Sequence, residues 1–253
     1  MNSQPRRATI NGLAHDAPRT AKRFLQRHSG VVGSVTEVRT VSPEFVLTYD
    51  DGPEPGGTDR ILTALAAHGA SATFFVLLSR ARRYRSLLSD VAAEGHEIAL
   101  HGLDHRALTE FSAAEVWRRT TDGKRELEDL SGQPVRWLRP PYGQQTLLTW
   151  RASRRAGVEP VLWGPSTCDA LDLTQAQRVD RAVSGAHAGT ILLAHDGFAG
   201  PLDGVDDGPE PRLDRGELTN GVLAAYRDRG LVGRSLGSAL EAGTIVRTAW
   251  FAR

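Results

Sequence analysis

Strand-length apolar runs alternate with helical patterns along most of this chain, and this alternation is the strongest constraint on its fold. Six or seven strand–helix units in a row imply a parallel sheet, either open or closed as a barrel, and a barrel suits a chain of 253 residues. The predicted strands cover 45–49, 72–77, 96–100, 135–138, 161–163 and 190–193. The predicted helices cover 58–69, 81–94, 112–130, 146–156, 174–187 and 217–229. We interpret residues 1–40, which carry no strong pattern, as an N-terminal arm packed on a main domain over 41–253.

The composition excludes several classes of partner. The 31 basic and 30 acidic residues leave a net charge of +1, which favours neither nucleic acid nor an anionic membrane. Cys168 is the single cysteine, so an internal disulfide and a multi-cysteine metal site are excluded. No secretion signal and no apolar stretch of transmembrane length is seen, so we expect a cytoplasmic protein. The oligomeric state stays open.

Two adjacent carboxylates, Asp50 and Asp51, follow directly after the apolar run 45–49. The Gly52–Pro53 pair behind them cannot continue a strand, so both acids are expected at a strand end. In isolation such a segment is more typical of a turn that caps a strand. In a barrel, however, catalytic residues lie at the C-terminal ends of the strands. Because neighbouring carboxylates repel each other, the pair favours a cation that gives the two acids different roles.

Two histidines follow the predicted strand 96–100. His101 and His105 lie four residues apart, and on one helical turn this spacing puts both imidazoles on the same face, able to hold one metal ion. A polar strand-to-helix connection is the alternative. With Asp51 they would make a metal site with open positions, and zinc is the default ion for these ligand types.

Three further polar residues follow other predicted strands. Arg139 comes after 135–138 and can pair with a buried acid. Asp169 is either the partner of that arginine or a helix-capping residue. His195 ends the strand 190–193 and becomes a candidate general acid, because the other polar residues are expected at the same end of the barrel.

These motifs together resemble those of the polysaccharide deacetylase family, carbohydrate esterase family four, whose domain is shared with the nodulation chitooligosaccharide deacetylases. The match runs from about 45 to 195, and its five motifs occur in the family's order at 48–53, 101–105, 139–143, 169 and 193–195. The resemblance implies a distorted (β/α)7 TIM-like barrel, in agreement with the alternation above. It also implies a metal-dependent enzyme that hydrolyses the acetamide of an N-acetylated amino sugar, oligosaccharide or glycan to free amine and acetate.

The resemblance implies a role for each matched residue. Asp51, His101 and His105 would bind one divalent metal ion, with zinc favoured and cobalt, nickel or manganese as alternatives. Asp50 would be the catalytic base and His195, in the same motif as Leu193, the general acid.

The remaining implied roles concern the residues around these groups. Arg139 would orient Asp50, and Asp169 would in turn hold Arg139. The backbone N–H of Tyr142 would help to bind the oxyanion.

Two positions depart from the family pattern. Gly102 stands where Ser or Thr usually follows the first metal-binding histidine, and we expect the metal site to survive this change. Ala170 stands where the family usually has a tryptophan that walls the substrate groove. With the acidic loop over 197–215 and the missing signal, this favours a small intracellular acetylated amino sugar over a cell-wall polymer.

The hexapeptide at 50–55 recurs letter for letter at 206–211. Only the first copy follows an apolar strand, so we interpret the repeat as coincidence and the second copy as part of a mobile loop rich in Gly, Pro and Asp. A loop that folds over the site as a lid is the less favoured alternative. A metal-binding role for Asp206 or Asp207 is less favoured still.

Two other functions stay open. The first is another amide hydrolase of the same superfamily, allantoinase-like or cyclic-imide-cleaving, although such relatives often lose the metal-binding acid that is retained here as Asp51. The second is a non-catalytic carbohydrate-binding protein on a decayed enzyme fold. The retention of both Asp50 and His195 counts against it.

Overall fold

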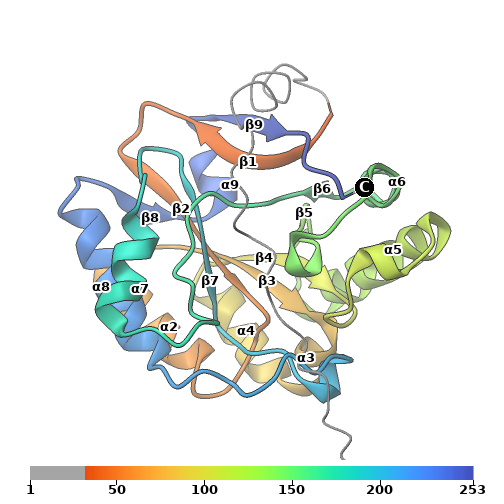
Figure 1. Cartoon of the computed structure of the whole chain (residues 1–253), viewed down its shortest axis with the longest axis horizontal. Helices are drawn as coiled ribbons and strands as arrows, with labels where there is room; N and C mark the ends of the chain where they lie inside the picture. Colours follow the sequence, from red (N-terminus) through yellow and green to blue (C-terminus); the bar gives the residue numbers. More distant parts are fainter. Residues whose placement is uncertain (1–31, 253) are drawn as a thin grey trace, which may run out of the picture.

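The computed structural model describes residues 32–252, in which parallel strands form a barrel with helices outside it (Figure 1). The seven-stranded sheet has the order β6-β5-β4-β3-β2-β7, and β8 pairs with β2. In chain order the strands are β2 (Glu44–Asp50), β3 (Thr73–Leu77), β4 (Glu97–Gly102), β5 (Trp137–Leu138), β6 (Glu159–Pro160), β7 (Ile191–His195) and β8 (Val232–Arg234). All the pairings within this sheet are parallel. The prediction of a distorted (β/α)7 barrel is confirmed.

The distortion is concentrated where β6 should meet β7. The irregular segment 164–167 takes the place of a regular ladder there: the Gly164 N–H donates to the Ile191 carbonyl at 2.9 Å, and the Leu193 N–H donates to the Pro165 carbonyl at 3.1 Å. The Thr167 N–H donates in turn to the Leu193 carbonyl at 3.0 Å. This segment brings the following residues, including Asp169, beside the end of β7.

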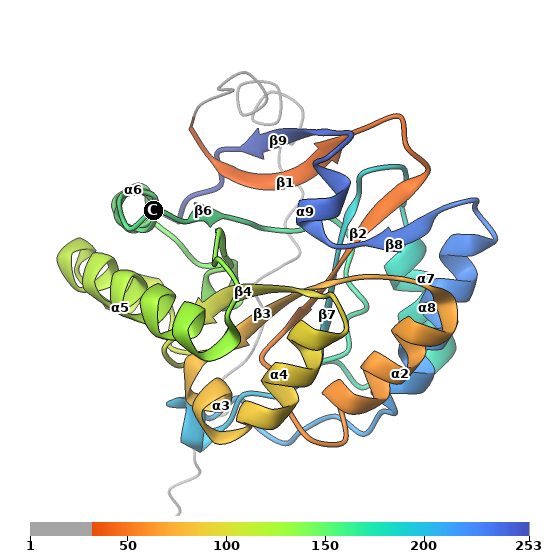
Figure 2. The same ribbon diagram turned by 180° about the vertical axis from the view of Figure 1, so that it is seen from behind.

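The helices cover the outside of the barrel, with α2, α7 and α8 on one side and α5 and α6 on the other (Figures 1 and 2). In chain order they are α2 (Thr58–His68), α3 (Leu78–Arg83), α4 (Arg85–Ala93), α5 (Ala113–Ser131), α6 (Leu147–Arg155), α7 (Gln175–Val183), α8 (Arg215–Arg227) and α9 (Leu236–Ala239). Short 3₁₀ turns lie at η1 (Leu108–Glu110), η2 (Pro141–Gly143) and η3 (Pro201–Asp203). Within residues 32–252, every helix is too short or too polar to cross a membrane.

A small antiparallel sheet made of β1 (Ser34–Arg39) and β9 (Thr244–Thr248) lies at one end of the barrel (Figure 1). Val35 of β1 forms a parallel bridge with Val161, so the strand is attached to the barrel wall. β1, which lies within the predicted arm, therefore pairs with the last strand of the chain and contacts the barrel. The arm's boundary at residue 40 stays a prediction, and residues 1–31 lie outside the described residues.

The two faces of β2 show how the barrel positions a site. Successive side chains of a strand point to opposite faces. Phe45 faces the outer helices and stacks on Tyr226 of α8 with 3.7 Å between the ring centroids, whereas Val46 belongs to the cluster that fills the barrel interior. Thr48 and Asp50 continue the series of Val46, so the last residue of β2 points toward the barrel interior at its C-terminal end.

Two predicted elements differ from the structure. The predicted helix 81–94 is two helices, α3 and α4, because Tyr84 has non-helical dihedrals of −122° and 53°. The predicted strand 161–163 lies earlier, at β6, where Glu159 and Pro160 pair with Trp137 and Leu138.

The predicted cap of α2 is also different. The helix has Gly57 as its N-cap, and no side-chain hydrogen bond caps it. The Thr58 hydroxyl instead donates to the Asp196 carboxylate at 2.6 Å. The Thr58 side chain therefore binds the residue that follows β7 and does not cap its own helix.

The loop 197–215 is tied to the barrel by buried charges. Arg80 of α3 is 4% exposed, and it donates to the Asp203 carboxylate from Nε at 3.0 Å and from Nη2 at 2.9 Å. Its Nη1 lies 3.0 Å from Glu54 Oε2, and the Ser79 hydroxyl donates to Asp203 at 2.8 Å. Asp203 is 1% exposed, so this carboxylate depends on its partners for charge compensation.

We expect Arg80→Met to lower the free energy of unfolding by about 3–5 kcal/mol, because it removes the cation that donates to the buried Asp203 and leaves this carboxylate with the more distant Arg83, at 3.8 Å. Arg82→Met is the matched control on the same helix, since Arg82 pairs with Glu126 at a side chain that is 50% exposed. We expect that change to cost less than about 1 kcal/mol. Urea unfolding measures both values, and equal losses in the two variants would contradict the anchoring role of Arg80.

Candidate metal centre and active site

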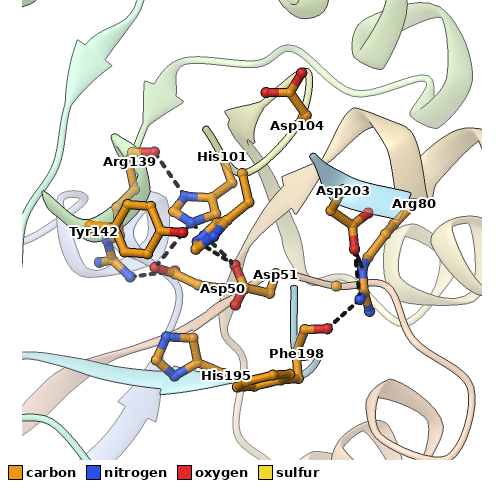
Figure 3. Close-up of polar contacts among 12 residues, drawn as sticks. Asp50, Asp51, Arg80, His101, Asp104, Arg139, Tyr142, His195, Phe198 and Asp203 are labelled. Carbon is orange, nitrogen blue, oxygen red and sulfur yellow. Dashed lines mark hydrogen bonds and ion pairs between the residues drawn. The ribbon is translucent and has the colours of Figure 1, made fainter. Parts of the chain in front are cut away.

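A pocket of about 430 Å³ opens at the C-terminal ends of the barrel strands. Eight of the residues predicted for the site line this pocket: Asp50, Asp51, His101, His105, Tyr142, Asp169, Leu193 and His195. Arg139 lies behind the pocket wall with no exposed surface. Figure 3 shows Asp50 and Asp51 between His101 and His195. The structure thus brings together all nine predicted residues, while their individual roles stay proposals.

Asp51 and the two histidines form a compact set of metal-ligand atoms. Asp51 Oδ1 lies 3.3 Å from His101 Nε2 and 3.2 Å from His105 Nε2, and one ligand atom of each residue lies within 4.8 Å of the others. All three residues are buried, and no donor from residues 32–252 makes a hydrogen bond to Asp51 Oδ1. A buried carboxylate oxygen without a donor, facing two imidazole nitrogens, fits a divalent cation.

The histidines reach this arrangement in a different way from the one predicted. His101 lies in β4 and His105 in the turn after it, so the two do not share a helical turn. The ring of His101 is oriented by its Nδ1, which donates to the Arg139 carbonyl at 2.8 Å and leaves Nε2 free to face Asp51. Burial alone would raise the pKa of Asp51, but contact with His101 and the charge of His105 hold this pKa well below its usual range.

Asp51 itself is held in an unusual backbone conformation. Its φ is +76°, a region that costs a non-glycine residue on the order of 1–3 kcal/mol. Asp196 supports this turn, since its Oδ1 accepts the Gly52 N–H at 3.0 Å and its Oδ2 accepts the Thr58 hydroxyl. Gly52 is needed here, because a Cβ would lie 1.9 Å from Asp196 Oδ2. Burial raises the pKa of Asp196 to about 7.

Gly102, the departure noted after the first histidine, also has a structural reason. Its φ is +144°, and an added Cβ would lie 2.6 Å from the Asp104 carbonyl oxygen. A side chain at this position is therefore excluded by the path of the backbone between the two histidines. The arrangement of His101 and His105 in this chain depends on glycine rather than on a hydroxyl.

Arg139 holds Asp50 inside the barrel. Its Nη1 donates to Asp50 Oδ1 at 2.7 Å and to the Thr48 hydroxyl at 2.8 Å, and its guanidinium lies 4.1 Å from the centroid of the Phe75 ring. Burial lowers the pKa of Arg139, and the Asp50 carboxylate opposes that shift. Arg139 therefore fixes the Asp50 carboxylate through Oδ1 and makes no hydrogen bond to Oδ2.

Asp169 has a different partner from the predicted one. The sequence prediction placed it on Arg139, but its Oδ1 lies 2.6 Å from His195 Nδ1 and its Oδ2 accepts the His195 backbone N–H at 2.8 Å. The physical reason is the irregular segment 164–167, which runs beside β7 and delivers Asp169 to the end of that strand.

The Asp169 contact sets the protonation of His195. Burial alone would lower the pKa of His195, but the Asp169 carboxylate outweighs burial and raises this pKa to about 10. The second ring nitrogen of His195 is left to face the pocket. The Asp169 contact therefore favours the protonated, imidazolium form of His195.

The loop 197–215 reaches the site, which corrects the interpretation of the second hexapeptide as a coincidence. Asp207 lines the pocket, and its two carboxylate oxygens accept the Tyr142 hydroxyl, both at 2.9 Å. The copy at 206–211 contributes one carboxylate, that of Asp207, to the lining of this pocket. The lid that we favoured less is the arrangement observed.

Sequence reasoning missed three further residues of the site. Asp196 follows His195 directly, and its position at a strand end was the available signal. Trp163 and Arg215 also line the pocket. Arg215 opens α8 and donates to the His195 carbonyl at 3.2 Å, a contact for which the sequence carries no signal.

The pocket combines three residues that could hold one metal ion with an Arg139-bound carboxylate and an Asp169-bound histidine. This combination is typical of a hydrolase that uses a metal ion. A sequence model of the polysaccharide deacetylase family matches residues 37–161. The chain belongs to this family.

Known members of the family show the extent of the likeness. The chain is 31% identical over 198 residues to a chitooligosaccharide deacetylase of Sinorhizobium fredii, covering 78% of this chain and 92% of that one. It is also 31% identical over 194 residues to the peptidoglycan-N-acetylmuramic acid deacetylase PdaC of Bacillus subtilis, covering 76% of this chain and 41% of PdaC, so it spans less than half of that protein. The solved structure of PdaC superposes with a TM-score of 0.67 at 27% identity, covering 79% of this chain and 91% of that one.

The Asp169–His195 pair predicts a measurable titration. In the metal-free protein we expect His195 to titrate with a pKa of about 10. The variant Asp169→Asn should lower the pKa of His195, because it removes the carboxylate that favours the imidazolium. Since the folded-state pKa is raised, the stabilisation by this pair is fully present below the ordinary histidine pKa of 6.5 and is lost as the pH rises toward 10. NMR titration of the imidazole measures the shift.

Asp180→Asn, an exposed change on α7, is the control and should leave the titration of His195 unchanged. A His195 that titrates near 6.5 in the unmodified protein would contradict the assignment.

Proposed function

We propose that this chain is a metal-dependent N-deacetylase that hydrolyses the acetamide of an N-acetylated amino sugar or glycan to free amine and acetate. One observation carries the proposal: a metal-ligand set, a carboxylate held by an arginine and a histidine held by an aspartate share one pocket. The Asp50 carboxylate is paired with Arg139 and the His195 imidazole with Asp169, so each of the two groups is held by its own partner of opposite charge. The two relatives described above are named as a chitooligosaccharide deacetylase and a peptidoglycan-N-acetylmuramic acid deacetylase, which supports the same reaction.

We propose zinc as the ion held by Asp51, His101 and His105. Two imidazoles and one carboxylate are a ligand set typical of zinc, and they leave coordination positions open. When bound, such an ion polarises a carbonyl group and lowers the pKa of water. Cobalt, nickel and manganese are the alternatives for this set.

The proton transfers are assigned to the two held side chains. Asp50 takes a proton from the attacking water, and Arg139 keeps its carboxylate oriented. His195 gives a proton to the departing nitrogen, so that the carbon–nitrogen bond breaks and amine and acetate leave. The Tyr142 backbone N–H, in a turn where φ is +58°, supports the oxyanion, a type of contact worth roughly 10²–10³ in rate.

The loop 197–215 lies along one side of the pocket, and this arrangement favours a small substrate or the end of a sugar chain. Asp207 contacts Tyr142 across the mouth, and Phe198 and Pro209 of the same loop line the pocket. Ala170, which also lines the pocket, has a much smaller side chain than the tryptophan usual at this position. We therefore favour a small acetamido sugar or a terminal residue over the interior of a polymer. A cytoplasmic location also stays a prediction.

Replacement of the base separates catalysis from metal binding. We expect Asp50→Asn to lower kcat by roughly 10²–10⁴, because the variant keeps the shape of the side chain but accepts no proton. Metal content, measured by mass spectrometry of the purified protein, should stay at that of the unmodified enzyme. Asp90→Asn, an exposed change on α4, is the control. Full acetate release by the Asp50 variant would overturn its role.

A substrate series tests the pocket. We expect acetate release from N-acetylated mono- and disaccharides to exceed release from chitin oligomers and peptidoglycan at equal acetyl concentration, because the loop 197–215 covers one side of the site. Efficient turnover of the polymers with none of the small sugars would contradict this. An enzyme inactive on every acetamido sugar, yet active on cyclic imides or ureides, would replace the proposed reaction itself.

A further inference from the structure

We propose that Asp207 is a positioning residue for the metal centre, which orients the ligand His105 from the side opposite to Asp51. The inference rests on the proposed metal site and adds a residue from the second copy of the hexapeptide. Asp207 contributes no ligand atom in this proposal; it acts through His105.

The observation behind the proposal is the unsatisfied nitrogen of His105. The side chain is 8% exposed, and its Nδ1 is buried without a hydrogen-bond partner in the described structure. This nitrogen faces Asp207 Oδ2 at 3.3 Å, while Nε2 of the same ring faces Asp51 at 3.2 Å. His105 therefore has a carboxylate on each side of its ring.

The neighbouring histidine shows what this geometry accomplishes. His101 uses its Nδ1–H on the Arg139 carbonyl, which fixes the ring and leaves Nε2 for the metal. A histidine that binds through Nε2 must carry its proton on Nδ1, and an acceptor there stabilises this tautomer and raises the basicity of the ligand. Among the described residues, Asp207 offers the acceptor that faces His105 Nδ1.

The position of Asp207 is determined from several directions. Its carboxylate accepts the Tyr142 hydroxyl, and the Tyr142 ring lies 4.4 Å from the His105 ring between centroids. The loop is held before this point, where the His105 N–H donates to the Asp203 carbonyl at 2.9 Å. It is held after it, where Arg215 pairs with Glu210 at 3.0 Å.

The two copies of the hexapeptide use their residues in parallel ways. In the first copy Asp51 faces one nitrogen of His105 and Glu54 pairs with the buried Arg80. In the second copy Asp207 faces the other nitrogen and Glu210 pairs with the buried Arg215. The repeat thus supplies both carboxylates that flank this ligand.

The test is zinc affinity, which requires no substrate. Metal-free protein is titrated with zinc in competition with a chromophoric chelator, for the unmodified chain and for Asp207→Asn and Asp207→Ala. We expect the affinity to fall about 10- to 100-fold, with the larger loss in the alanine variant. In NMR spectra of the zinc-bound protein, the Nδ1–H signal of His105 should exchange faster with water in both variants.

Two control variants separate the carboxylate from other effects. Asp206→Asn removes the same charge from an exposed neighbour and should leave zinc affinity unchanged. Tyr142→Phe keeps the ring against His105 but removes the hydroxyl that holds Asp207, so its loss should be smaller than that of Asp207→Ala. Melting temperatures of the metal-free variants verify that each is folded.

The outcomes distinguish this inference from the proposed function. Equal zinc affinity in Asp207→Ala and the unmodified chain would overturn the inference alone, as would an equal loss in Asp206→Asn. A chain that binds no zinc or other divalent ion would overturn the proposed metal centre together with the inference.

Discussion

The buried ion pair between Arg139 and Asp50 is the interaction on which the rest of the site depends. It links the end of β5 to the end of β2 across the barrel interior, where Arg139 also contacts the Phe75 ring. The same arginine accepts His101 Nδ1–H on its backbone carbonyl and donates its own N–H to the Leu100 carbonyl. One residue therefore orients the proposed base with its side chain and a proposed metal ligand with its backbone. Removing one partner of a buried ion pair costs about 3–5 kcal/mol, so the Arg139–Asp50 pair also contributes to the stability of the folded barrel.

Strain is concentrated at the same end of the barrel. Among residues 32–252, three non-glycine residues have positive φ, namely Asp51, Tyr142 and Cys168, and the first two line the pocket. Such conformations persist only where neighbouring contacts hold them. For Asp51 the contact is the Asp196 carboxylate beneath Gly52. The conformation brings both carboxylates of the 50–51 pair to one site, although neighbouring side chains of a regular strand would point to opposite faces.

The fold could be predicted from the sequence to the extent that it depends on local patterns. Strands covered on both faces are continuous apolar runs, and β3, β4 and β7 lie within two residues of their predicted starts and ends. The two-residue strands β5 and β6 have no such run, since their positions depend on pairing with each other and with β4. Tyr84, which packs partly buried against the hydrophobic core, divides a predicted helix at a position where the sequence has no Gly or Pro signal. Thr58 was misassigned for a similar reason: its hydroxyl has a partner from β7 that no helix-cap pattern reveals.

The sequence by itself determined that the polar residues at the strand ends, among them Asp50, His101 and His195, reach the pocket, because strand ends are marked locally by apolar runs and the Gly and Pro residues that stop them. Only the tertiary structure decided which of these residues are partners. Asp169 pairs with His195, 26 residues away, rather than with Arg139, and Asp50 pairs with Arg139 at a separation of 89 residues. Identical hexapeptides at 50–55 and 206–211 show the difference most directly, since one is a strand end and the other a loop that returns to the same histidine. The two copies have the same local sequence, so the contacts of each carboxylate are determined by the barrel and by the ion pairs that hold the loop 197–215, and not by the hexapeptide itself.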